Sequence, residues 1–153
     1  MTKEEMWTGV RRHMDAEFRQ DVYGALNTMS AQPFYEFHPL GLHIGGRHAI
    51  AEMYRRMWPN IYPYVVASES LTMGTQSGGG PIWHGQSGLV IREWAEVLPP
   101  GGKRQAISEM AIFHFKDELL VGETIYCNGP LSDLTKKALG ADFAGIPGVR
   151  ALY

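Results

Sequence analysis

Apolar residues recur every four positions through the first part of the chain, which is the spacing of one face of an α-helix. The residues with this spacing are Met6, Val10, Met14, Phe18 and Val22. The pattern predicts a long N-terminal helix. Asp21 can cap a second, shorter helix. Pro33 is expected to stop that helix because proline has no backbone N–H to donate and its ring clashes with the preceding turn.

A short strand and a third helix are predicted next. Residues 34–38 look extended, and the residue before Pro39 is disfavoured in helical geometry. After a glycine-rich turn, residues 47–58 carry a one-sided apolar face made by Ile50, Met53, Tyr54, Met57 and Trp58. Pro59 is expected to end this helix.

From residue 64 onward the hydrophobic period changes to two, which is typical of β-strands. Four long strands are predicted, over residues 64–75, 82–97, 104–115 and 119–127. Turn-forming segments separate them, at 77–81, 99–102 and 116–117, and these short gaps indicate antiparallel neighbours. Gly85 and Gly88 suggest a bulge or bend inside the second strand.

The chain ends in one more predicted helix, over residues 132–139, with Ser132 as its N-cap and Gly140 just beyond its end. Helices followed by a curved antiparallel sheet form an α+β layout. We expect a cone-shaped α+β barrel, in which N-terminal helices pack on a strongly curved, mostly antiparallel sheet. The natural cavity lies between the concave face of the sheet and the helix that crosses it.

Composition narrows the function further. The 153 residues predict one domain, and a net charge of -2 argues against nucleic-acid or anionic-membrane binding. The single cysteine, Cys127, excludes a disulfide framework within the chain and any CxxC site. No apolar run approaches a membrane span, and the acidic N-terminus does not look like a signal peptide. We therefore expect a cytoplasmic protein.

Large soft apolar residues are abundant, with 4 Trp, 7 Tyr, 6 Phe and 8 Met. Such residues fill cores, but they also line pockets for flat hydrophobic ligands. The six histidines show no HxH or HxxxH spacing and no accompanying acidic cluster, and no phosphate-binding or dinucleotide motif is present. We expect no metal and no cofactor.

Several motifs resemble the NTF2-like superfamily, in its branch of SnoaL-like polyketide cyclases and ketosteroid isomerases. The motifs are residues 28–41, residues 46–50 with Tyr54, residues 113–117 and residues 123–126. The resemblance implies a single such domain over 1–153 and a homodimer formed through the outer sheet face. It also implies a cofactor-free lyase, isomerase or cyclase with an enclosed hydrophobic pocket.

The resemblance also implies roles for particular residues. His38 falls where the isomerases keep the carboxylate that moves a proton, and Tyr54 falls on their cavity-facing tyrosine of the third helix. Their oxyanion-binding tyrosine falls near His13 or Met14. Ala111 replaces the protonated acid of their oxyanion hole, and Glu109, on the same strand face, is the nearest ionisable substitute.

The residues themselves allow more than one interpretation. His38 is either a base that reaches into a pocket or a loop histidine bonded to backbone. His13 and Glu17, one helical turn apart, form either an acid–base pair or a solvated ion pair. Glu109 lies either on the wet face of the sheet or in the cavity with a raised pKa.

An aromatic lining is expected to complete the pocket, formed by Trp58, Phe113, Tyr126 and Trp94. The leading hypothesis is general acid–base catalysis by His38, Glu109, His13 and Tyr54 on a small hydrophobic, ring-containing substrate. The alternatives are a non-catalytic ligand-binding protein and a dimerisation module. In the dimerisation module, Met110, Ile112 and His114 would form the contact face.

Overall fold

The computed structural model describes residues 1–66, 81–85 and 87–153. Helix α1 (Lys3–Phe18) begins with a capping box, in which Thr2 and Glu5 exchange hydrogen bonds at the first turn. Helix α2 (Val22–Asn27) is capped by the Asp21 side chain, as the sequence predicts. None of the described helices is both long and apolar enough to cross a membrane.

Helix α3 (Arg47–Ile61) is longer than predicted, because Pro59 lies inside it rather than at its end. Proline removes one backbone hydrogen bond, but it does so in the last turn, where Trp58 and Ile61 are both buried in the core. The chain then continues as a 3-10 turn, η2 (Tyr62–Tyr64). Packing of the apolar face therefore extends the helix past a residue that usually stops one.

Among the described residues, eight strands form one sheet in the order β3-β5-β6-β7-β1-β2-β8, with β4 paired to β5 beside this path. The strands are β1 (Met29–Phe37), β2 (Leu42–Gly45), β3 (Val65–Val66), β4 (Pro81–His84), β5 (Gly88–Val97), β6 (Gln105–Lys116), β7 (Leu119–Cys127) and β8 (Val149–Ala151). All neighbours are antiparallel except β1 and β7, which run parallel. The predicted α+β class with a mostly antiparallel sheet is confirmed.

Two predicted strands differ from the observed ones. The segment predicted as one strand over 82–97 is a hairpin, because the Gly85 amide donates to the Gly88 carbonyl and turns the chain between β4 and β5. The strand predicted over 64–75 is described only for its first residues, as β3. Its remainder and the predicted turn at 77–80 lie outside the described residues.

Strand β1 starts earlier than predicted and runs through Pro33. His38, predicted as the end of this strand, instead begins the 3-10 turn η1 (His38–Leu40). Helix α4 (Gly129–Leu139) starts three residues before the predicted N-cap, and Asn128 caps it by accepting from the Leu131 amide. A short turn, η4 (Phe143–Gly145), leads to the last strand.

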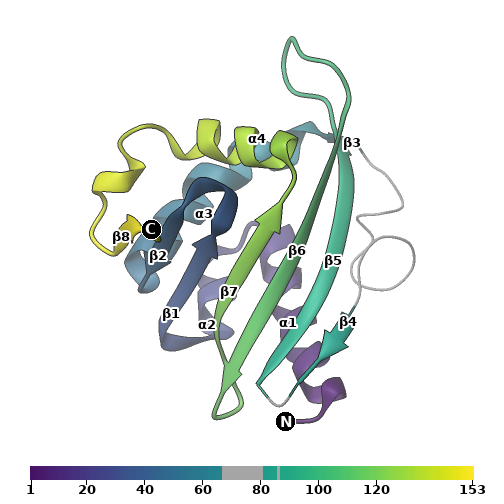
Figure 1. Cartoon of the computed structure of the whole chain (residues 1–153), viewed down its shortest axis with the longest axis vertical. Helices are drawn as coiled ribbons and strands as arrows, with labels where there is room; N and C mark the ends of the chain where they lie inside the picture. Colours follow the sequence, from purple (N-terminus) through teal and green to yellow (C-terminus); the bar gives the residue numbers. More distant parts are fainter. Residues whose placement is uncertain (67–80, 86) are drawn as a thin grey trace.

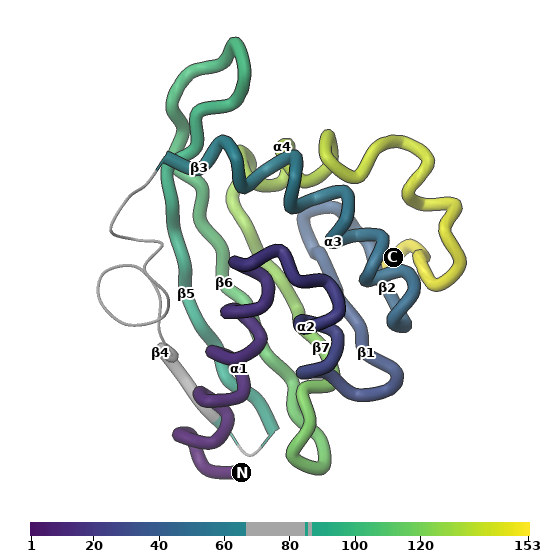
Figure 2. The backbone as a smooth tube through the Cα atoms, turned by 180° about the vertical axis from the view of Figure 1, so that it is seen from behind, coloured from purple at the N-terminus to yellow at the C-terminus, as the bar shows by residue number. Residues whose placement is uncertain are grey.

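The helices and the sheet make two layers. Helices α1, α2 and α3 cover one face of the sheet, and α4 crosses the end at which β7 finishes (Figures 1 and 2). The side chains between the layers form the main core, whose largest fully buried members include Tyr35, Tyr54 and Phe113. The inner face of the sheet and helix α3 thus enclose the space in which polar groups gather.

Candidate active-site cavity

A cavity of about 140 Å³ lies between the helices and the inner face of the sheet. An engineered cavity of about 150 Å³ is known to admit benzene, so this one suits a guest with a single ring. Its aromatic lining includes Phe18, Tyr35, Phe37, Tyr54, Trp58 and Tyr62. Its carboxyl groups are Glu17, Glu93, Glu109 and Glu123. The walls are therefore apolar, with acidic groups placed among them.

Helix α3 and turn η2 supply an aromatic ladder, formed by Tyr54, Trp58 and Tyr62. These residues are four apart, so their side chains lie along one helical face. The Tyr54 and Trp58 rings stack with centroids 4.2 Å apart, and Trp58 and Tyr62 stack at 6.3 Å. The ladder gives one wall of the cavity an extended π surface.

A buried chain of hydrogen bonds crosses the cavity floor. The Tyr54 and Tyr35 hydroxyl oxygens are 2.6 Å apart, and the Tyr35 hydroxyl donates to Glu123 Oε1 at 2.5 Å. Because Tyr35 has one proton and gives it to Glu123, Tyr54 donates to Tyr35. On the other side of Glu123, His13 Nε2 lies 3.0 Å from the same carboxylate oxygen.

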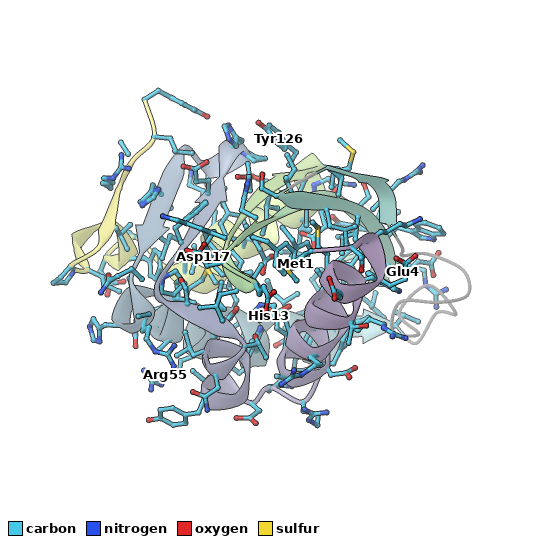
Figure 3. All side chains as sticks on the ribbon, turned by 90° about the horizontal axis from the view of Figure 1, so that it is seen from below. Met1, Glu4, His13, Arg55, Asp117 and Tyr126 are labelled. Atoms are coloured by element: carbon cyan, nitrogen blue, oxygen red, sulfur yellow. The ribbon has the colours of Figure 1, made fainter. Side chains whose placement is uncertain are left out.

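The protonation state of His13 follows from its two neighbours. The Thr28 hydroxyl donates to the Ala25 carbonyl at 2.6 Å, so it must accept from His13 Nδ1, 2.5 Å away. Nε2 faces the carboxylates of Glu17 at 3.4 Å and Glu123 at 3.0 Å. Burial alone would lower the pKa of His13, but these carboxylates overcome it and raise that pKa to about 10. His13 is therefore an imidazolium at neutral pH (Figure 3 shows it between α1 and the sheet).

Glu93 of β5 pairs with Glu109 of β6, so their two carboxyl groups are neighbours on the same face of the sheet. Burial raises the pKa of Glu93 to about 7, and it raises the pKa of Glu109 well above its ordinary value, with Glu93 adding to the effect. Two adjacent carboxyl groups in an apolar site cannot both ionise readily, so this pair shares a proton near neutral pH.

His38 is not part of this cavity. Its ring stacks on Tyr126 with centroids 4.4 Å apart, and its backbone carbonyl accepts from the Tyr153 hydroxyl. Tyr126 is 45% exposed and lies on the side of the sheet away from the helices (Figure 3). The prediction that His38 and Tyr126 face the pocket is therefore wrong, because both lie on the outer face of the sheet.

The other predicted residues divide into two groups. Glu109, Tyr54 and Trp58 border the cavity, and Trp94 borders it at the rim, where 42% of its surface is exposed. His13 and Phe113 lie behind the cavity wall, packed edge to face with ring centroids 6.4 Å apart. The roles given to all of them remain predictions.

Sequence reasoning missed Glu93, Glu123 and Tyr35. A signal for Glu93 was present, because a hairpin centred on residue 101 places residues 93 and 109 opposite each other. Glu123 and Tyr35 also pair across β7 and β1, but this pairing is parallel and joins distant segments. No turn fixes the register of such strands, so the sequence offers no comparable signal.

One group of residues in the described part of the chain has the composition of a metal site. The ligand atoms of His13, Glu17 and Glu123 lie within 4.8 Å of one another. Both ring nitrogens of His13 carry protons in the hydrogen-bond scheme above, and a metal would have to displace the proton on Nε2. A complete hydrogen-bonded ion cluster thus accounts for these three residues.

Comparison with known proteins supports the fold. No protein-family model matches the chain, and no curated protein matches its sequence. An NTF2-like protein from Burkholderia xenovorans is 14% identical, with a TM-score of 0.67 over 89% of this chain and 99% of that chain. A proposed isomerase from Bacillus subtilis is 18% identical, with a TM-score of 0.59 over 86% and 92%.

A third structure, from Catenulispora acidiphila, is described as having a ketosteroid isomerase-like fold and was determined in complex with trimethylamine. It is 14% identical, with a TM-score of 0.56 over 82% of this chain and 86% of that chain. These similarities show that the chain has the NTF2-like fold, shared with ketosteroid isomerase-like proteins.

Proposed function

We propose that the protein is a cofactor-independent lyase, isomerase or cyclase that moves protons at carbon within a small hydrophobic, ring-containing substrate. The observation that carries this proposal is the Glu93–Glu109 pair, whose members are cross-strand neighbours that line an aromatic cavity, where burial raises the pKa of both. A group that titrates near the working pH can both accept and return a proton. The pair takes the place that the sequence alone gave to His38.

The proposed reaction starts at a C–H bond next to a carbonyl group. The ionised carboxylate of the pair accepts the proton, and the C–H electrons form an enolate. The enolate then takes a proton back at another carbon, expels a leaving group, or attacks a carbonyl of the same molecule. These outcomes are isomerisation, elimination and cyclisation, and each balances without an external oxidant or reductant.

The buried tyrosines supply a donor for the developing negative charge. Tyr54 lines the cavity, and its hydroxyl is the outer end of the chain that runs through Tyr35 to Glu123. A substrate oxygen next to Tyr54 would accept this proton in place of Tyr35. The imidazolium of His13, 3.2 Å from the Tyr54 oxygen, adds positive charge behind it.

The structural comparisons support a small organic guest. The ketosteroid isomerase-like protein from Catenulispora acidiphila binds trimethylamine, and one neighbour of the same fold is a proposed isomerase. We take both as support for a ligand pocket in this chain.

Turnover of cyclic enones, cyclic ketones and hydroxylated aromatics tests the proposal. The double variant Glu93→Gln, Glu109→Gln keeps the shape of both side chains but leaves neither able to accept a proton, so kcat should fall by about 100-fold or more. His38→Ala is the matched control on the outer face and should leave kcat unchanged. If the wild type and the variants all bind the ligand but none of them turns it over, the result would favour the alternative function, a non-catalytic binding protein.

We also propose that two copies of the chain associate through the outer sheet face. Met110 and Tyr126 are 43% and 45% exposed and are cross-strand neighbours on β6 and β7. Ile112 and His114 continue the same face of β6 and are only partly buried. An exposed apolar face of this kind favours self-association, which light scattering after size-exclusion chromatography measures.

A further inference from the structure

The charges around the cavity are unbalanced. Glu17 and Glu123 face the His13 imidazolium at 3.4 and 3.0 Å, so one positive charge stands against these two carboxylates. Glu93 and Glu109 have no such counter-charge. Among the described residues that line the cavity there is no lysine, arginine or histidine, and neither carboxyl group forms an ion pair within the described part of the chain.

A second polar group also lacks a partner. Thr135 of α4 lines the same cavity and is fully buried, and its hydroxyl has no hydrogen-bond partner among the described residues. A buried hydroxyl without a partner is unfavourable, so such groups are rare in folded proteins. A polar group on a guest in the cavity would satisfy it.

The opposite wall suits the ring of a guest. The Tyr54, Trp58 and Tyr62 rings stack on one another and line the cavity, so they offer an apolar aromatic surface to a ring-containing guest. Glu93, Glu109 and Glu123 extend from three neighbouring strands on the sheet side. An ammonium group on the sheet side would contact carboxylate oxygens, and the ring that carries it would contact the aromatic wall.

We infer that the cavity takes a ring-containing amine as its ammonium ion, with the nitrogen beside the Glu93–Glu109 pair and the ring against the aromatic ladder of Tyr54, Trp58 and Tyr62. This inference deepens the proposed function, because it concerns the substrate class of the same cavity. The carboxylates would pair with the nitrogen, and the ring would fill the apolar remainder. The Thr135 hydroxyl would bond a second polar group of the guest.

Binding of the cation would also act on the acid–base pair. A positive charge beside Glu93 and Glu109 favours their ionised forms, so the shared proton leaves as the amine enters. The groups that oppose or add to this effect are Glu17 and His13 on α1 and Glu123 on β7. An amine substrate would therefore convert the pair into a base at the moment of binding.

Benzylamine and benzyl alcohol provide a matched test. They have nearly the same shape, and near neutral pH the first is an ammonium ion while the second is neutral. We expect isothermal titration calorimetry to show at least about tenfold tighter binding of benzylamine, which corresponds to about 1.4 kcal/mol. The double variant Glu93→Gln, Glu109→Gln should remove this preference and leave benzyl alcohol affinity intact.

The control is the double variant Glu4→Gln, Glu118→Gln, which removes the same charge from two exposed positions. It should keep the preference for benzylamine. Equal affinity for the two probes, a preference that survives in the Glu93, Glu109 variant, or no binding of either probe would overturn the inference. If benzyl alcohol binds equally well and neutral ketones are turned over through the carboxyl pair, the proposed function stands without the amine.

Discussion

The carboxyl pair should make the protein less stable as the pH rises, and Glu93→Gln should remove part of that loss. The pKa of Glu93 rises from 4.5 to about 7 on folding, mainly through burial. A group with a raised folded-state pKa contributes its full stability below pH 4.5 and loses it as the pH rises through about 7. The stability is lost because the Glu93 carboxylate ionises in a site with little water.

The size of the effect follows from the shift. At about 1.4 kcal/mol per pKa unit, the shift from 4.5 to about 7 corresponds to about 3 kcal/mol. Water reaches part of the Glu93 side chain, which reduces the expected effect to about 1 to 2 kcal/mol. Glutamine has no charge to desolvate, so Glu93→Gln should match the wild type near pH 4.5 and exceed its stability above pH 7.

Urea unfolding followed by tryptophan fluorescence at several pH values measures this difference. The pKa of His13 is also raised, to about 10, so its stability contribution is lost at higher pH. That loss occurs in both proteins and cancels in the comparison. Glu4→Gln controls for the removal of one charge from the surface. If the difference in free energy of unfolding between the two proteins does not change with pH, or if the variant is less stable than the wild type above pH 7, ionisation of Glu93 does not destabilise the fold.

Three further substitutions test other parts of the structure. Tyr35→Phe removes the hydroxyl that joins Tyr54 to Glu123 and should reduce the free energy of unfolding by about 1 to 3 kcal/mol in urea, whereas a change near zero would argue against the buried network. Gly122→Ala would place its Cβ 2.5 Å from the Phe34 ring and should lower the free energy of unfolding by about 1 to 3 kcal/mol. The control Gly129→Ala, whose Cβ meets nothing within 4 Å, should be tolerated. Equal effects of the two substitutions would contradict this packing. Met110→Glu puts a charge on the outer sheet face and should halve the mass seen by light scattering, while a dimer that persists would place the interface elsewhere.

Much of the fold could be predicted from the sequence, because hydrophobic period and turn residues act locally. The period of four in α1 and the period of two in β5 to β7 match the observed elements. Two predictions were wrong for different reasons: that Pro59 ends the third helix, and that residues 82–97 form one strand. Buried neighbours carried helix α3 past the proline, and a short glycine turn split the segment into β4 and β5.

The site was less predictable, since it depends on which face of a strand each side chain occupies. The sequence leaves Glu109 between the wet face of the sheet and the cavity, because apolar residues occupy both faces of the strand around it, and the structure places it at the cavity. His38 could not be placed correctly, because the turn η1 follows β1 directly and carries the ring to the outer face beside Tyr126. A family resemblance locates the position in the sequence, but the local backbone decides where the side chain lies.

Hydrogen exchange at carbon separates proton transfer by the carboxyl pair from ligand binding alone. Cyclic ketones and amino ketones incubated with the protein in D₂O lose their α-proton signals in ¹H NMR if a base removes those protons, whatever the final product. We expect enzyme-dependent exchange that falls by about 100-fold or more in the double variant Glu93→Gln, Glu109→Gln and is unchanged in His38→Ala. Exchange that is equally fast in the double variant would contradict proton transfer by the carboxyl pair.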